Sequence, residues 1–179
     1  MSDIGTIIVD MQPNFLDSHK RIARDSYKKI ESIINLRDYS IKNNIYTLLV
    51  EMTGKNYQQT IQEVDFSWLP KFFKLQNDAF EQEGRYLDLS NLNSSSGSIK
   101  LEKILRKKDL SRLIIAGVND PNCVTKTIIS AKKNGFEVLT SKDIIFNTTY
   151  AFSEETFRKI KECTSLFENY TQLIKEIEK

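Results

Sequence analysis

The sequence is poor in histidine and cysteine, and each shortage excludes a class of site. Its 179 residues include one histidine, His19, so a Ser-His-Asp or Cys-His catalytic pair would depend on that residue alone. A zinc site built from several histidines is excluded. The two cysteines, Cys123 and Cys163, are too few for a disulfide framework.

Long apolar runs and a strong charge of one sign are also missing. No apolar run approaches the roughly 18 residues that span a bilayer, and the first ten residues lack the features of a signal peptide. The 26 basic and 24 acidic residues leave a net charge of +2. This balance argues against nucleic acid or an anionic membrane as the main partner. We therefore expect a cytoplasmic protein.

Short apolar, β-branched runs alternate with amphipathic stretches along the whole chain. The expected strands are residues 6–9, 45–50, about 72–73, 113–116 and 136–139, and the expected helices are about 22–43, 98–108, 121–133, 153–163 and 170–178. Alternating strands and helices favour parallel βαβ units. The pattern predicts an α/β fold, a doubly wound, mainly parallel sheet with helices on both faces in a Rossmann-like three-layer α/β/α arrangement.

No composition break or internal repeat divides the chain, so we expect one domain over residues 1–179. A polar insert at about 81–98 contains Ser94, Ser95, Ser96 and Gly97, and its composition predicts a surface loop.

Three chemically active side chains follow expected strands. Asp10 ends the first strand, Lys74 ends the strand near residue 72, and Cys123 follows the strand at 113–116. Ligands of open α/β sheets bind beyond the carboxyl ends of the strands. The sequence therefore places a carboxylate, an amine and a thiol at one edge of the sheet.

The residues before Cys123 predict the start of a helix. Asp120 is a good N-cap and Pro121 suits the first helical position, which puts Cys123 in the first turn. A helix N-terminus favours the thiolate and offers free N–H groups to an oxyanion. With no histidine available, Asp10 is the natural base for the thiol, and Lys74 would balance the charge.

Three motifs resemble the isochorismatase-like cysteine hydrolases over nearly the whole chain. They are D-x-Q-x-x-F from Asp10, K-x-x-x-x-A-F from Lys74 and G-V-x-x-x-x-C-V from Gly117. The resemblance implies a Cys-Asp-Lys triad that hydrolyses a C–N bond of a small molecule through a thioester. It implies that the amides of Asn119 and Cys123 form the oxyanion hole, and it suggests a homo-oligomer.

Four residues near these motifs are candidate substrate contacts: Gln12, Phe15, Phe80 and Val118. Gln12 and Phe15 would alternatively support the loop after the first strand. Phe80 would alternatively pack in the core.

The sequence also departs from the family pattern. Metal-binding nicotinamidases of this family carry Asp-x-His after the second strand, whereas this chain has Glu51, Met52, Thr53 and Gly54 there. We therefore expect no metal and no cofactor. Asp78 replaces the usual serine before Ala-Phe and would bring negative charge near the site. Two alternative functions stay open: vinyl-ether hydrolysis of the isochorismatase type, and a non-catalytic binding or scaffold role.

Overall fold

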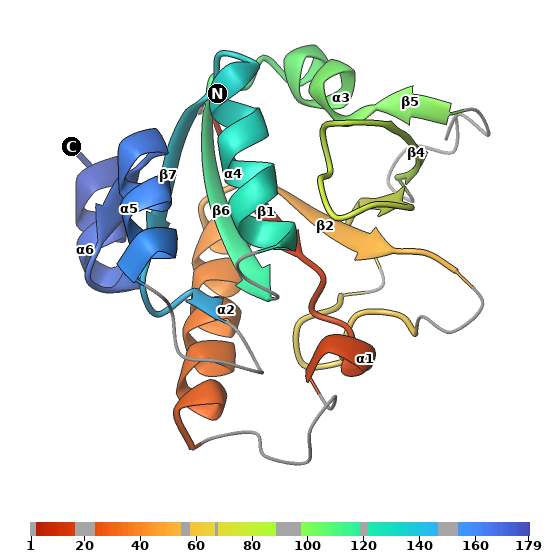
Figure 1. Cartoon of the computed structure of the whole chain (residues 1–179). Coiled ribbons are helices and arrows are strands. Elements are labelled where there is room, and N and C mark those ends of the chain that lie inside the picture. The colour runs from red at the N-terminus through yellow and green to blue at the C-terminus, as the bar shows by residue number, and fades with distance from the viewer. Residues whose placement is uncertain are drawn as a thin grey trace.

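The computed structural model forms one mixed sheet flanked by helices (Figure 1). It describes residues 3–16, 24–54, 58–66, 68–88, 98–118, 122–146 and 154–179. The strands are β1 (Ile4–Val9), β2 (Tyr46–Met52), β3 (Lys71–Lys74), β4 (Glu83–Leu87), β5 (Ser98–Lys100), β6 (Arg112–Val118), β7 (Glu137–Ser141), β8 (Ile145–Phe146) and β9 (Ser165–Phe167). Their order in the sheet is β5-β4-β3-β2-β1-β6-β7-β9, with β8 paired to β6.

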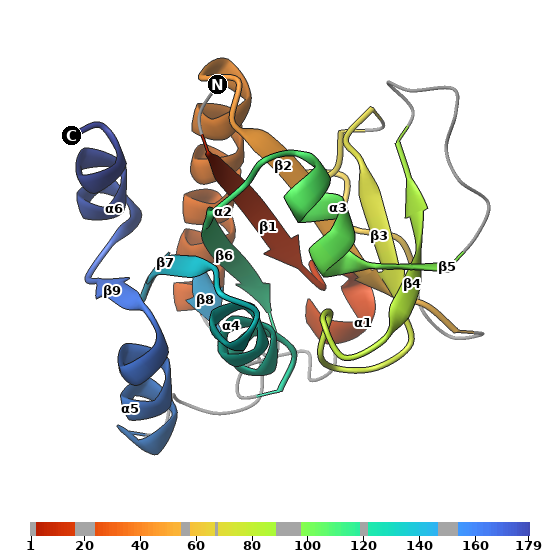
Figure 2. The ribbon, with the colours of Figure 1, turned by 90° about the horizontal axis from the view of Figure 1, so that it is seen from above.

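Helices cover both faces of this sheet. They are α1 (Pro13–Leu16), α2 (Arg24–Lys42), α3 (Leu101–Lys107), α4 (Cys123–Lys133), α5 (Glu154–Cys163) and α6 (Tyr170–Ile177). Figure 2 shows α2 and α6 on one face and α3, α4 and α5 on the other. The predicted doubly wound α/β/α fold is confirmed. No described helix has both the length and the apolarity that crossing a membrane requires.

The order of the strands reverses at the centre of the sheet. β1 pairs in parallel with both β2 and β6, and the chain then builds outward through β3 on one side and β7 on the other. Connections therefore leave the carboxyl ends of β1 and β6 toward opposite faces. This is the switch point where open α/β sheets form their binding crevice.

The central strands are apolar throughout because helices cover both of their faces. Ile7, Ile8 and Val9 of β1 and Ile114 and Ile115 of β6 are all buried. Such continuous β-branched runs are typical of parallel strands inside an α/β layer. This is why the sequence alone located them.

The polar insert is not wholly a loop, which corrects the sequence prediction. β4 lies within it and runs antiparallel to β3, and β5 begins at its last residue. An antiparallel strand that leaves one side exposed does not need an apolar sequence, so the polar residues of β4 concealed it. Residues 89–97 lie outside the described part of the chain.

Gly117 in β6 allows the two central strands to lie unusually close together. It pairs with Val9, has a φ of 132°, and a Cβ atom there would lie 2.1 Å from the Val9 carbonyl oxygen. Backbone atoms of a central strand cannot move aside to relieve this overlap. A glycine is therefore required directly beside the end of β1.

We predict that Gly117→Ala lowers the free energy of unfolding by about 3 kcal/mol, because it combines overlap with an unfavourable φ. Gly135→Ala is the matched control, since φ is 79° there but the nearest atom is an Arg106 side-chain nitrogen at 3.4 Å. Gly135→Ala should lower the free energy of unfolding by only about 1 kcal/mol. Urea unfolding measures both, and equal losses would contradict the close approach.

Candidate active site

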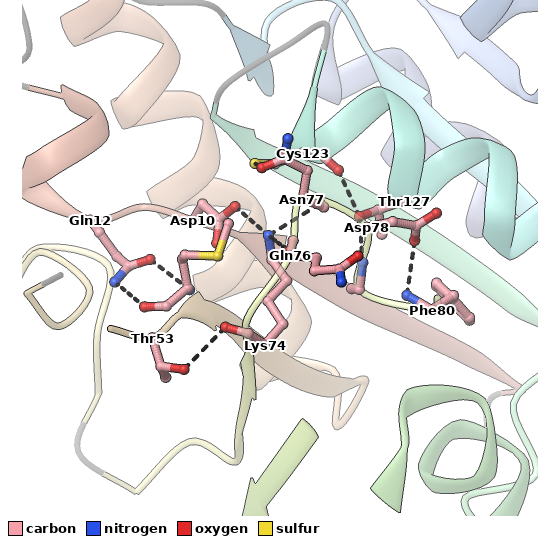
Figure 3. Close-up of polar contacts among 12 residues, drawn as sticks. Asp10, Gln12, Thr53, Lys74, Gln76, Asn77, Asp78, Phe80, Cys123 and Thr127 are labelled. Atoms are coloured by element: carbon pink, nitrogen blue, oxygen red, sulfur yellow. Dashed lines mark hydrogen bonds and ion pairs between the residues drawn. The ribbon is translucent and has the colours of Figure 1, made fainter. Parts of the chain in front are cut away.

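The carboxyl edge of the sheet brings together the three side chains singled out in the sequence. Asp10 follows β1, Lys74 is the last residue of β3, and Cys123 is the first residue of α4, which follows β6. Figure 3 shows them converging from these separate elements. All three are buried. The cluster lies at the switch point of the sheet.

Lys74 and Asp10 form an ion pair that is wholly inside the protein. Lys74 Nζ lies 2.7 Å from Asp10 Oδ2, and both side chains are 0% exposed. Nζ also donates to the backbone carbonyls of Gln76 at 3.1 Å and Asn77 at 3.2 Å. Three acceptors thus match the three protons of the ammonium group, which is what a buried charge needs.

Asp10 has a strained backbone. Its φ of 53° lies in the left-handed region, which non-glycine residues seldom occupy. The Asp10 N–H donates to the Val50 carbonyl at 2.8 Å, and the Asp10 carbonyl accepts from the Gln12 N–H at 2.7 Å. Oδ1 accepts no hydrogen bond from any group in the described ranges. The strained turn holds an acceptor ready inside the site.

The Cys123 thiol lies within reach of both members of this ion pair. It interacts with the Asp10 carboxylate and with the Lys74 ammonium group. It also donates to Asn77 Oδ1 across 3.7 Å. A carboxylate, an ammonium group and an amide therefore all face the sulfur.

The ionisation of Cys123 differs from the sequence expectation. Burial, with a further contribution from the Asp10 charge, raises the pKa of the thiol to about 12, although Lys74 opposes this. The helix begins at Cys123 with Asn122 as its N-cap, whose side chain makes no capping bond. The expected cap at Asp120 and helical start at Pro121 fall on residues outside the described ranges. A pKa raised in this way favours the neutral thiol at neutral pH.

The pKa of Asp10 is shifted in the direction that suits a general base. Burial raises the pKa of its carboxyl group above the ordinary value, against the opposing effects of Lys74 and Cys123. A higher pKa means a greater affinity for a proton once one is offered. The site thus combines a thiol that is a weaker acid than usual with a carboxylate that is a stronger base than usual.

Gln12 braces the loops around Asp10. Its Oε1 accepts from the Met52 N–H at 2.8 Å, and its Nε2 donates to the Met52 carbonyl at 3.0 Å and to the Gln58 carbonyl. The side chain is buried. These bonds favour the supporting role over the predicted substrate contact.

The structure gives the other predicted substrate contacts different positions. Phe15 lies half-buried on α1, and Val118 is buried at the end of β6. Phe80 packs against Phe136, with ring centroids 5.9 Å apart, just before the amino end of β7. Phe80 is thus directed away from the carboxyl edge, so the structure does not bring it into the cluster. Asn119, the predicted oxyanion-hole residue, lies outside the described residues.

Asp78 does not bring free charge to the site, contrary to the sequence expectation. One carboxylate oxygen accepts from the Phe80 N–H at 2.9 Å, and the other accepts from the Ser130 hydroxyl on α4. Its role is to fasten the segment after β3 to this helix. Asn77, which sequence reasoning missed, is the residue of this segment that contacts the sulfur, and no motif singled it out.

Glu51 stands where metal-binding relatives were expected to carry a ligand, and here it is paired with protein groups. It accepts from the Thr60 hydroxyl at 2.8 Å and lies 3.2 Å from Lys71 Nζ. Across the described ranges, no group of three or more His, Cys, Asp or Glu side chains is arranged to hold a metal ion.

These features define a doubly wound α/β protein with a buried thiol, carboxylate and ammonium group at its switch point. The family model for the isochorismatase domain matches residues 5–171. The chain belongs to the isochorismatase family of hydrolases.

Solved structures share the fold at low sequence identity. An isochorismatase family protein from Desulfovibrio vulgaris is 14% identical, with a TM-score of 0.77 and coverage of 100% of both chains. N-carbamoylsarcosine amidase from Thermoplasma acidophilum is 13% identical, with a TM-score of 0.68 and coverage of 92% of this chain and 94% of that one. A nicotinamidase from Staphylococcus aureus is 14% identical, with a TM-score of 0.69 and coverage of 94% and 99%. No curated protein matches by sequence.

We predict that Lys74→Met costs about 3–5 kcal/mol of unfolding free energy, because it leaves Asp10 buried without its cation. The control is Lys142→Met, which removes the surface ion pair between Lys142 Nζ and Glu168 Oε1 at 2.6 Å. The side chains of Lys142 and Glu168 are 41% and 66% exposed. This surface pair should contribute at most about 1 kcal/mol. Both losses are measured by urea unfolding at pH 7, and similar values for the two variants would argue against the buried pair.

We also predict the pH dependence of Cys123 reactivity. With a thiol pKa near 12, the thiolate is rare at neutral pH, so alkylation by iodoacetamide should rise about tenfold per pH unit from 7 to 10. Mass spectrometry of a Cys163→Ser protein follows the single remaining thiol. When the same protein is unfolded in urea, its alkylation rate should stop rising with pH near the ordinary cysteine pKa. A plateau below pH 9 in the folded protein would be inconsistent with the raised pKa.

Proposed function

We propose that this protein is a cysteine hydrolase that cleaves a C–N bond of amide type in a small molecule, through a thioester on Cys123. The observation that carries the proposal is the wholly buried Lys74–Asp10 pair with the thiol against it. The proposal takes residues 1–179 as one domain, acting in the cytoplasm without metal or cofactor.

In the first step, Asp10 accepts the thiol proton while the sulfur attacks the substrate carbonyl carbon. The carbonyl π electrons move to oxygen and form a tetrahedral oxyanion. Because the thiol pKa is raised to about 12, a thiolate formed in advance would be scarce. Proton transfer coupled to attack avoids that scarce species, and the raised pKa of Asp10 assists the transfer.

In the second step, the oxyanion collapses and the C–N bond breaks. Asp10 gives its proton to the leaving nitrogen, and a thioester remains on Cys123. Water then attacks the thioester while Asp10 takes one of its protons, and collapse releases the acid. Asp10 finally returns that proton to the sulfur, so every proton is accounted for.

Lys74 and the start of α4 stabilise the charges that form in these steps. Lys74 stays paired with Asp10 and keeps its carboxylate oriented toward the sulfur. The first helical bond of α4 runs from the Lys126 N–H to the Asn122 carbonyl at 3.0 Å, so the Cys123 N–H precedes the helical ladder. We assign this N–H and that of Asn119 to the oxyanion hole.

The raised pKa of Asp10 also favours a second candidate function, vinyl-ether hydrolysis of the isochorismatase type. A carboxyl group that retains its proton to a higher pH can act as a general acid and protonate the alkene carbon of a vinyl ether. The cysteine is then dispensable. This candidate therefore differs from the first in its dependence on sulfur.

We predict that Cys123→Ala lowers amide hydrolysis by at least about a thousandfold. The substrates are a panel of small amides and ureas, and product is measured by mass spectrometry. The wild-type protein should also show an acyl adduct on the Cys123 peptide. Cys163→Ala is the matched control, because this half-buried cysteine on α5 has no part in the mechanism, and its rate should be unchanged.

Two outcomes would redirect the proposal. Isochorismate cleavage that persists in Cys123→Ala would favour the vinyl-ether reaction. Equal amide-hydrolysis rates for wild type and Cys123→Ala, with no adduct, would favour a binding or scaffold role. Light scattering on the same samples tests the proposed homo-oligomer.

A further inference from the structure

Asn77 is the one residue outside the Cys-Asp-Lys cluster whose side chain is seen to hydrogen-bond to the reacting sulfur within the described residues. Its Oδ1 accepts from Cys123 Sγ at 3.7 Å, and its backbone carbonyl accepts from Lys74 Nζ at 3.2 Å. Figure 3 shows the amide beside Cys123. The side chain is half-buried.

The turn that carries Asn77 is fixed through its backbone. The Gln82 amide lies against the N–H groups of Leu75 and Gln76, and in the orientation that pairs its oxygen with these donors it accepts from them at 2.8 Å and 2.6 Å. Lys74 Nζ bonds the carbonyls of Gln76 and Asn77. Backbone donors and acceptors of this turn are therefore both hydrogen-bonded, which fixes the position of the Asn77 backbone.

The residues after Asn77 are fastened to the helix that begins with Cys123. The carboxylate of Asp78 bonds Ser130, and the Thr127 hydroxyl accepts from the Ala79 N–H at 3.4 Å while donating to the Cys123 carbonyl at 2.6 Å. Asn77 thus lies between two anchored points that both connect to the catalytic cluster. The backbone of Asn77 is therefore held near Cys123.

We infer that Asn77 is a further catalytic residue that serves the sulfur in both of its protonation states. Its Oδ1 accepts from the neutral thiol, and after the proton moves to Asp10 the amide turns so that Nδ2 donates to the thiolate. The inference rests on the proposed function for its place in the reaction. An amide side chain carries a donor and an acceptor on one rotatable group, which suits this exchange.

The donating orientation is the one that matters for reactivity. A thiol is a weak donor, whereas a hydrogen bond to a buried anion is charge-assisted and about twice as strong as a neutral one. The amide therefore stabilises the thiolate more than the thiol. Removing it should make the thiolate harder to form, even though an acceptor for the S–H group is lost at the same time.

The test compares alkylation of Cys123 by iodoacetamide in a Cys163→Ser background between pH 7 and 10. Asn77→Asp replaces the amide by an anionic acceptor of the same shape, and Asn77→Leu removes donor and acceptor. A rise of one unit in the thiol pKa lowers the thiolate fraction tenfold, and greater intrinsic nucleophilicity offsets part of this. We expect both variants to react at least about threefold more slowly at each pH.

Asn43→Asp is the matched control, since it makes the same charge change at an exposed residue near the amino end of β2, the opposite edge of the sheet. Its alkylation profile should equal that of the parent. Unchanged or faster alkylation in folded Asn77→Asp and Asn77→Leu would overturn the inference. If Asn77→Leu fails to fold by circular dichroism, Asn77→Ser, which lacks the amide and adds no apolar group, replaces it in the comparison.

The assay contains no substrate, so it separates this inference from the proposed function. Slower alkylation supports the role of Asn77 toward the sulfur even if no amide is ever hydrolysed. Alkylation of the Asn77 variants at the rate of the parent protein rejects that role, even if amide hydrolysis depends fully on Cys123.

Discussion

The buried ion pair between Lys74 and Asp10 is the interaction on which the rest of the site depends. Removing two charges from water is costly, and here the cost is offset by a 2.7 Å contact and by two backbone carbonyls that satisfy the remaining ammonium protons. The same burial keeps the Cys123 thiol neutral and strengthens Asp10 as a base. One desolvated environment thus raises the pKa of both the Cys123 thiol and the Asp10 carboxyl group, and the proposed chemistry follows from these two shifts.

The backbone holds this pair in place. Asp10 occupies a left-handed conformation at the end of β1, and beside it Gly117 lets β6 approach more closely than any side chain would permit. Gln12 accepts from the Met52 N–H at the end of β2, and Lys74 donates to the Asn77 carbonyl in the turn after β3. The strain at Asp10 persists because these surrounding contacts outweigh it. The site is therefore preorganised by the sheet and its connections.

Sequence patterns located the central strands and the three clustered side chains because both signals are local. Continuous β-branched runs mark β1 and β6, and the residues that follow such runs must emerge at one edge of a parallel sheet. The same reasoning missed β4, because an antiparallel strand with one exposed side need not be apolar. It left two roles open for Phe80, and the contact with Phe136 favours core packing. It also failed for the thiol pKa. A helix N-terminus is visible in a sequence, but the burial that raises the pKa of the thiol is not.

By itself, the sequence determined the α/β class, the doubly wound order of elements and the identity of the thiol, carboxylate and ammonium group, since these depend on periodicity and on which residues end the strands. Only the tertiary structure decided that Asp78 turns toward α4, that Asn77 reaches the sulfur and that burial raises the pKa of the thiol. Those outcomes depend on packing between segments far apart in the chain. Burial and electrostatic interaction are properties of that packing, and no local pattern encodes them.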